Sequence, residues 1–480
     1  MSFLPLKKYS PSNLQLKISP LGFFQGNNMK KRFVPILAIT AAIICGPALA
    51  EEKSVYQCYQ DWQFQPVTVA STNADSLVRH QMDFTVPTHG PWLINPSYDS
   101  ITVNWITRVP CGAAIDYRKK GEKEFKRIWK TTYGQIDYSS DMHPFHLTGL
   151  EPATDYEYRL VSTMSTYKTA YCYAGVFEGR EIHSFRTLDP KLDRYQVFVT
   201  ADLHGSARLC LDPMIENCGA TNALLHFFLG DNVEDNMNDA RYNTTFGFLD
   251  DVCRRWGKDK ATVFLRGNHD TWGPESYNWR DYFPRLDEKS YQAVSAGPVL
   301  FICLDTMAAG YGSAINRKIV ADYYEEQAQW IRDMKKTPTW KNARFRIVMA
   351  HFGSHGGEQQ KLVSDTFKNV LNETGKDKRI HLFLAGHDHS YARFDPKSVI
   401  AKAGPYPSRN TFSNDFNYAE VYCHIQEGMT IDVTKDKLTI KSHLWSKYPG
   451  TGLRDAFELL PDGSVHDLME VKTYNPPGHK

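Results

Sequence analysis

The chain has 480 residues, of which 42% are hydrophobic and 23% are charged, and its formal net charge is +2 at pH 7. This length allows two domains with separate cores, and the composition is that of an ordinary globular protein. A charge so close to zero gives no electrostatic footprint for nucleic acid or for an anionic membrane, so function is expected in a pocket.

The N-terminal segment has the pattern of an export signal. Residues 1–28 contain nothing typical of a folded element and are expected to be unstructured or untranslated, with Met29 as a second candidate start. Residues 29–50 combine a basic start, a short apolar run and an Ala-Leu-Ala end, which is typical of a signal peptide cleaved after Ala50. The alternative is a membrane anchor, but an apolar run of about 18 residues with two prolines is a poor bilayer span. We expect a secreted or periplasmic protein without a membrane anchor after cleavage.

The cysteines permit disulfides in such a compartment. Of nine cysteines, Cys45 leaves with the leader, and an even number remains. Cys210 with Cys218 is the pairing expected first, whereas Cys303 lies in an apolar run and is equally well explained as a buried thiol. Without a Cys-x-x-Cys pattern, a thiolate zinc site is not supported.

Residues 51–190 predict an all-β domain. Short alternating strands occur at residues 100–105, 145–160 and 183–187, separated by turns, which favours a β-sandwich. The strand containing Trp105, the Leu-x-Gly-Leu-x-Pro-x-Thr-x-Tyr segment at 147–156 and the closing Phe-x-Thr together resemble a fibronectin type III domain.

Residues 191–480 predict an α/β domain. Strands alternate with amphipathic helices, the clearest of which lie at 321–336 and 358–371. Residues 400–480 return to a strand pattern and are expected to complete the sheets of this catalytic domain. His226 and His381 lie inside apolar strands and are expected to be core residues.

Five apolar strands of this domain end in residues of the types that bind metals in proteins. Such polar groups are costly at the tip of a buried strand unless they have partners, and open α/β sheets place their sites at these strand ends. The five segments cover residues 197–204, 224–234, 262–270, 345–351 and 380–389, and they supply Asp202, His204, Asp231, Asn268, His351, His387 and His389.

Seven nitrogen and oxygen donors are too many for one zinc ion and suit two metals. The natural division gives one ion Asp202, His204 and His389 and the other Asn268, His351 and His387, with Asp231 bridging both. Two divalent ions, two aspartates and a hydroxide leave a net positive charge that favours a phosphate. His269 is then free to donate a proton to a leaving alkoxide, with Asp270 to orient it.

At these residues the chain resembles the calcineurin-like metallophosphoesterases. The blocks are Asp-x-His at 202–204, Gly-Asp-x-x-Glu at 230–234, Gly-Asn-His-Asp at 267–270, the lone His351 and Gly-His-x-His at 386–389. The resemblance implies a four-layer β-sandwich flanked by helices and a dinuclear metal centre with the ligands named above. It also implies in-line attack by a metal-bridging hydroxide, with His269 contacting the phosphate and donating a proton.

The preceding sandwich and Tyr391 resemble the purple acid phosphatase branch, with one departure. His204 and Glu234 stand where that branch has a glycine and the tyrosine that binds ferric iron. We therefore expect no tyrosinate absorption band, and Fe, Mn and Zn are all compatible with the ligands.

Three functions follow from these patterns. A phosphomonoesterase acting on a small-molecule phosphate ester is favoured by the sandwich, and a phosphodiesterase or nucleotide hydrolase is favoured by Asp-x-His. An inactive binding module on the same fold is the remote alternative, since every ligand is retained. His355 and Tyr391 are candidates for substrate contact, and Asp305 for a capping or packing role. The sequence does not decide the oligomeric state.

Overall fold

The structure is a computed structural model in which the leader is not among the described residues. The described residues all belong to one compact unit. The described residues are 86–165, 173–179, 181–233, 245–272, 274–307, 314–355, 357–398, 401, 416–425, 427–445 and 452–470. The expected signal peptide at 29–50 and Glu234 lie outside them.

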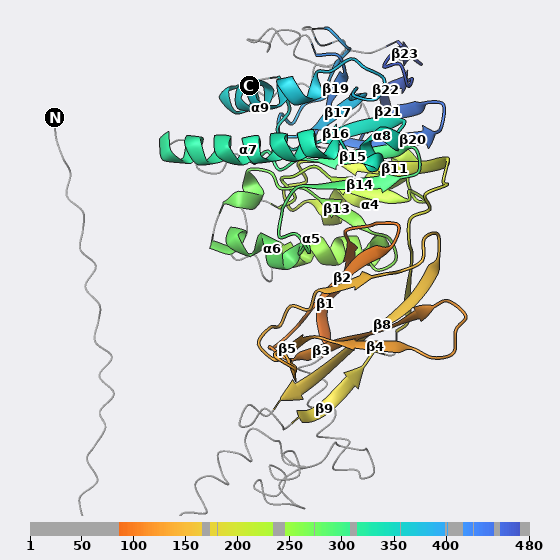
Figure 1. Cartoon of the computed structure of the whole chain (residues 1–480), viewed down its shortest axis with the longest axis vertical. Helices are drawn as coiled ribbons and strands as arrows, with labels where there is room; N and C mark the ends of the chain where they lie inside the picture. Colours follow the sequence, from red (N-terminus) through yellow and green to blue (C-terminus); the bar gives the residue numbers. More distant parts are fainter. Residues whose placement is uncertain are drawn as a thin grey trace, which may run out of the picture. The chain divides into compact units, whose positions relative to one another are not determined.

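Two mixed sheets form the second half of the chain (Figure 1). The seven-stranded sheet has the order β13 (Thr262–Phe264), β12 (Leu225–Phe228), β11 (Arg194–Thr200), β20 (Glu427–Thr434), β21 (Leu438–Leu444), β22 (Gly452–Leu459) and β23 (Val465–Asp467). The six-stranded sheet has the order β14 (Gln292–Ala296), β15 (Val299–Cys303), β16 (Phe345–Met349), β17 (Leu382–Ala385), β19 (Ala419–Tyr422) and β18 (Ala392–Phe394). In each sheet the three strands that lead into candidate ligands or lie beside them, β11 to β13 and β15 to β17, run parallel.

The sheets face each other across a shared core, and helices cover their outer faces. The helices are α4 (Ala207–Cys218), α5 (Thr245–Val252), the π-helix η2 (Cys253–Gly257), the 3₁₀-helices η3 (His269–Thr271) and η4 (Pro274–Asn278), α6 (Trp279–Tyr282), α7 (Ala314–Met334), α8 (Pro338–Asn342) and α9 (Glu358–Leu371). Helices α4 to α6 pack on the seven-stranded sheet, and α7 to α9 pack on the six-stranded sheet. The arrangement is the helix–sheet–sheet–helix sandwich expected from the sequence.

Strand β16 shows why the central strands read as continuous apolar runs. Phe345, Ile347 and Met349 point into the core between the sheets, while Val348 packs under the helices of the other face. Because both faces are covered, the strand is buried along its whole length. Each central strand therefore delivers its next polar residue from a fixed position.

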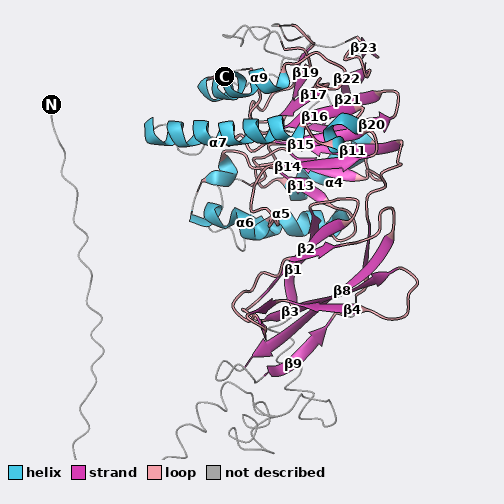
Figure 2. Ribbon diagram, viewed as in Figure 1, coloured by secondary structure: helices cyan, strands magenta, loops and turns pink. Residues whose placement is uncertain are grey.

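The first part of the described chain is a β-sandwich, and Figure 2 shows strands and loops but no helix in its described residues. One sheet contains β1 (Pro87–Ile94), β2 (Ser100–Thr107) and β7 (Phe145–Thr148), and the other contains β10 (His183–Arg186), β8 (Asp155–Ser165), β3 (Gly112–Lys119), β4 (Lys126–Trp129) and β9 (Tyr173–Glu178). A small hairpin adds β5 (Thr131–Thr132) and β6 (Gln135–Ile136). The core includes Trp105, stacked on Phe145.

The sandwich is joined to the α/β part by buried contacts. Trp92 Nε1 donates to Tyr282 O at 3.1 Å, and Asn95 Nδ2 donates to Pro284 O at 2.7 Å. Trp92 and Ile106 belong to the same apolar cluster as Phe246 and Tyr282. The two parts therefore share a core.

Two sequence-based expectations need correction. Helix α7 begins at Ala314 rather than at 321, because its first turns expose Ile315 (75%) and Ile319 (59%) and so carry no apolar periodicity. The pairing of Cys210 with Cys218 is wrong, since both thiols are free and buried on α4. Eight residues of helix separate the two by about 12 Å, beyond the reach of a disulfide. Cys303 is a free buried thiol.

No helix in the described part of the chain combines the length and the apolarity that a membrane crossing requires.

The buried His381 should make the stability of the protein fall at acidic pH. Its Nε2–H donates to Pro461 O at 3.1 Å, and its Nδ1 accepts from Arg346 N at 3.1 Å. Burial lowers the pKa of His381 from 6.5 to about 4, so stabilisation is complete above pH 6.5 and is lost as the pH falls toward 4. Between pH 6.5 and 4 the free energy of unfolding of the wild-type protein should fall by about 3 kcal/mol because of His381, and His381→Gln should abolish this fall. Urea unfolding at several pH values measures the effect. Equal pH slopes in the wild-type protein and in His381→Gln would contradict the assignment.

Candidate metal centre

The candidate ligands occupy strained backbone immediately after the parallel strands. Asp202, His204, Asp231, His387 and His389 have positive φ angles of 54°, 46°, 50°, 72° and 51°. A side chain in this left-handed region costs of the order of 1–3 kcal/mol and persists where the surroundings enforce it. Five such residues among seven candidate ligands indicate a site at which backbone strain is tolerated in order to orient the side chains.

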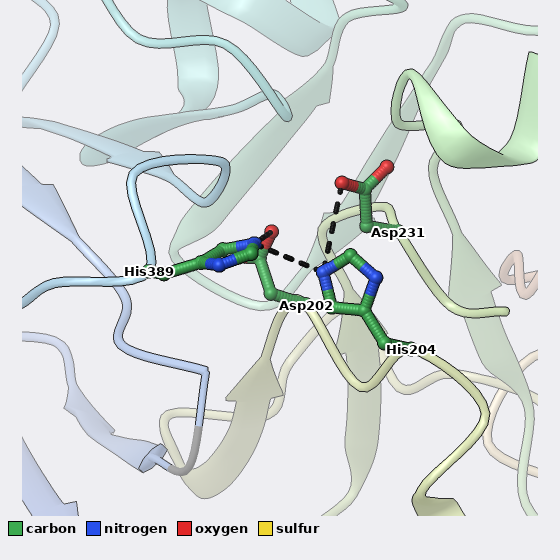
Figure 3. A group of neighbouring side chains, drawn as sticks. All are labelled: Asp202, His204, Asp231 and His389. Atoms are coloured by element: carbon green, nitrogen blue, oxygen red, sulfur yellow. Dashed lines mark hydrogen bonds and ion pairs between the residues drawn. The ribbon is translucent and has the colours of Figure 1, made fainter. Parts of the chain in front are cut away.

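The first group of donors contains Asp202, His204, Asp231 and His389, whose ligand atoms all lie within 4.8 Å of one another (Figure 3). His204 Nε2 lies 2.9 Å from His389 Nε2, and His389 Nε2 lies 3.5 Å from Asp202 Oδ1. His204 Nε2 lies 3.9 Å from Asp231 Oδ2. Imidazole nitrogens and carboxylate oxygens that converge in this way suit a divalent cation.

The second group contains Asp231, His351 and His387, again within 4.8 Å of one another. Asn268 joins it, because its Oδ1 lies 3.1 Å from His351 Nε2 and 3.0 Å from His387 Nδ1. His351 Nε2 lies 3.2 Å from Asp231 Oδ2. The structure thus brings all seven predicted ligands together in two groups, and Asp231 is common to both.

The charge balance of the site also fits a cation. Burial raises the pKa of Asp231, but the charges and hydrogen bonds of His351 and His269 together outweigh burial and hold that pKa well below its usual range. Burial lowers the pKa of His351, yet the carboxylates, Asp231 first among them, raise it to about 9. The carboxylates therefore favour a positive charge at this place, which a metal ion would supply after displacing the proton.

Backbone groups hold the ligands in their orientations. His351 Nδ1–H donates to Leu229 O at 3.0 Å, which leaves Nε2 free to face Asp231. The Asp202 carboxylate accepts from the backbone N–H of His387 at 3.0 Å, and Asp231 Oδ1 accepts from the N–H of His269 at 2.8 Å. Each of these bonds ties the loop after one strand to the loop after another.

His269 lies at the edge of the centre and Asp270 lies beneath it. The His269 ring is 4.5 Å from that of His204, and its Nε2 is 3.9 Å from Asp231 Oδ2. The expectation that Asp270 orients His269 is wrong for the described residues, because its buried carboxylate accepts instead from Gly267 N at 2.8 Å and Asn232 N at 3.2 Å. Burial and the charge of Asp231 raise the pKa of Asp270 to about 7. Asp270 therefore fixes two ligand loops against each other.

The two candidates for substrate contact are enclosed by protein. Tyr391 lies in the core between the sheets, and its hydroxyl donates to Asp455 Oδ2 at 2.5 Å, so the structure does not support a substrate contact. His355 is 4% exposed, its Nδ1 lies 2.9 Å from Glu420 Oε2, and its ring stacks on Phe394. Asp305 is the ion-pair partner of Arg266, so its role is structural but electrostatic rather than the capping or packing role expected of it.

Sequence reasoning missed Glu420 and Asp455. Each carboxylate is buried in a strand and serves one of the residues above, Glu420 with His355 and Asp455 with Tyr391. For Glu420 the one signal was a charged residue between the apolar Ala419 and Val421, whereas Asp455 lies beside Arg454 and gave no such signal.

Comparisons with known proteins agree with this fold. Residues 195–391 match the family model of the calcineurin-like phosphoesterases, and a search of curated proteins finds no match. A solved structure of PhoD is similar in fold, with a TM-score of 0.53 and 12% identity over 81% of this chain and 94% of that one. A redesigned β-sandwich protein and a myokine match locally at 19% identity, over 20% and 22% of this chain and 89% and 96% of their own, with TM-scores of 0.15 and 0.17. Those two matches carry no argument about the fold.

Proposed function

We propose that this chain, whose residues 195–391 match the calcineurin-like phosphoesterase family, is a metal-dependent phosphoesterase, exported from the cell, that hydrolyses small-molecule phosphomonoesters. Export is supported by the signal pattern at 29–50. If the protein is exported and the signal is cleaved after Ala50, N-terminal sequencing of the mature protein should start at Glu51. The N-terminal β-sandwich, which we propose to be fibronectin type III-like, supports the monoesterase assignment.

One observation carries the proposal of a dinuclear centre. Asp231 holds its carboxylate within reach of both donor groups while its own backbone is strained at φ 50°. A single carboxylate shared by two sets of nitrogen and oxygen donors is the arrangement that paired ions require. Two bound cations would lower the pKa of a water and stabilise the charge that develops on phosphate.

The remaining steps belong to the chain's own side chains. Asn268, as a neutral ligand, leaves the charge of the centre positive, which favours a phosphate dianion. His269, at the edge of the donor groups, is the proton donor for the leaving alkoxide, and its buried Nδ1 has no hydrogen-bond partner among the described residues. Its ring nitrogen Nε2 lies 3.9 Å from Asp231 Oδ2.

Hydrolysis of phosphodiesters or nucleotides is the second candidate. It is supported by His204, which completes the Asp-x-His pattern and lies 2.9 Å from His389 among the donors. The imidazole of His204 and the carboxylate of Glu234 are the two departures of this chain from the purple acid phosphatase pattern.

A rate comparison tests the proposal. The purified protein should contain two metal ions per chain, show no visible tyrosinate band, and hydrolyse p-nitrophenyl phosphate faster than its bis ester. Faster cleavage of the bis ester would favour the second candidate, and hydrolysis of neither ester by the metal-loaded protein would reject both.

His269→Gln should lower turnover of p-nitrophenyl phosphate by about 10²- to 10⁴-fold, the usual contribution of a general acid. Metal content and thermal stability should stay unchanged, because His269 is not one of the seven donors. Unchanged turnover would remove the proton donor, and a loss of metal would make His269 a ligand instead.

A further inference from the structure

Trp272 is an exposed indole beside the candidate metal centre. Its side chain is 41% exposed, and it is the only tryptophan in the exposed class among the residues that the structure describes. An aromatic ring left in water forgoes the free energy that burial of its apolar faces would provide. A second partner is therefore worth seeking for this ring.

The position of Trp272 is fixed relative to the metal ligands. It follows η3, where Thr271 N and Thr271 Oγ1 both donate to Asn268 O, at 3.1 and 2.7 Å, and Trp272 N donates to His269 O at 3.2 Å. These bonds hold the backbone of Trp272 against the loop that carries Asn268 and His269.

A continuous row of rings connects Trp272 to the donors. The Trp272 ring lies 4.2 Å from that of His269, His269 lies 4.5 Å from His204, and His204 lies 4.8 Å from His389. A phosphate held by the donors and protonated by His269 must direct its ester oxygen toward His269. The organic group attached to that oxygen then lies on the side of Trp272.

The segment around Trp272 also borders space for an organic group. Thr271, the residue before Trp272, lines a cavity of about 760 Å³ together with Ser276 and Tyr277, although neither Trp272 nor a candidate metal ligand is among its lining residues. Tyr277 is 85% exposed, so a second aromatic ring is available there.

We infer that Trp272 is a specificity-determining residue that packs against the leaving group, and that the substrates are phosphate esters of alcohols carrying a flat ring. The inference rests on the proposed phosphoesterase function and names the substrate class of that same site. Aromatic pairs contribute enough to change affinity by about 2- to 12-fold, so the effect is measurable.

Two non-hydrolysable probes test the inference without the reactivity of the ester. Phenylphosphonate and methylphosphonate share the phosphonate group and differ in the ring, and their binding to the metal-loaded protein is measured by calorimetry and by inhibition of p-nitrophenyl phosphate hydrolysis. Trp272→Ala should weaken phenylphosphonate by about 2- to 12-fold and leave methylphosphonate unchanged. Trp272→Phe should recover part of the loss.

The control is Tyr133→Ala, which removes a fully exposed aromatic ring from the hairpin of β5 and β6 and should change neither probe. Equal weakening of both probes by Trp272→Ala, a loss of bound metal, or no change would overturn the inference while the proposed function stands. A wild-type protein that hydrolyses no phosphate ester and binds neither probe would instead reject the proposed function, and the inference with it.

Discussion

Asp231→Asn is expected to lower turnover by about 10³-fold or more and to leave the protein with fewer than two metal ions per chain. Asp231 is the residue common to both donor groups, and its carboxylate is buried beside His351. An amide removes the negative charge and offers one oxygen where two are needed, so several kcal/mol of stabilisation of the transition state are lost.

The fold should survive this change. The amide oxygen of Asn can still accept the bond that His269 N donates to Asp231 Oδ1. Metal analysis, turnover of p-nitrophenyl phosphate and thermal unfolding measure the three effects. Asp436→Asn, at an exposed turn, is the matched control. Two retained ions with wild-type turnover would show that no shared carboxylate is needed.

Gly267→Ala should also disrupt the centre, although glycine carries no donor. A Cβ at this position would overlap Asp231 Oδ1 and would lie 2.8 Å from Asp231 Cγ. The shared carboxylate or the loop of Asn268 must then shift, at a cost of about 1–3 kcal/mol for overpacking. We expect a loss of bound metal and a fall in turnover of about 10²-fold, as for other changes that misplace a ligand.

Gly247→Ala supplies the control for Gly267→Ala. Gly247 lies in α5, where an added Cβ meets nothing within 4 Å. Alanine in a helix should stabilise the protein by about 0.5–1 kcal/mol, with metal content and turnover unchanged. A Gly267→Ala protein that keeps both ions and full activity would show that Asp231 lies elsewhere when metals are bound.

The candidate ligands were predictable because each has a local signal in the sequence, a metal-ligand side chain at the end of an apolar run. Asp231 and His351 directly follow apolar runs, and the parallel order of β11 to β13 and β15 to β17 brings these run ends together. The boundaries of α9 were also predicted correctly, and its buried apolar residues Val363, Phe367, Val370 and Leu371 recur at helical spacing.

The partners of those residues were not predictable, because they depend on contacts between distant segments. Asp270 reads as a neighbour of His269, yet its carboxylate bonds to Asn232, which is 38 positions away. Glu420 reads as an ordinary strand residue until the pairing of β17 with β19 places it beside His355. Local pattern shows which side chain a strand delivers, while tertiary packing decides what that side chain touches.

The shared core of the two β-rich parts has a practical consequence for dissecting the protein. Trp92 and Ile106 pack in the same apolar cluster as Phe246 and Tyr282, so a fragment that starts after the N-terminal sandwich would expose an apolar patch to water. Such a fragment should aggregate rather than behave as an autonomous catalytic module. The N-terminal sandwich is therefore an integral part of the folded enzyme and not a separable domain.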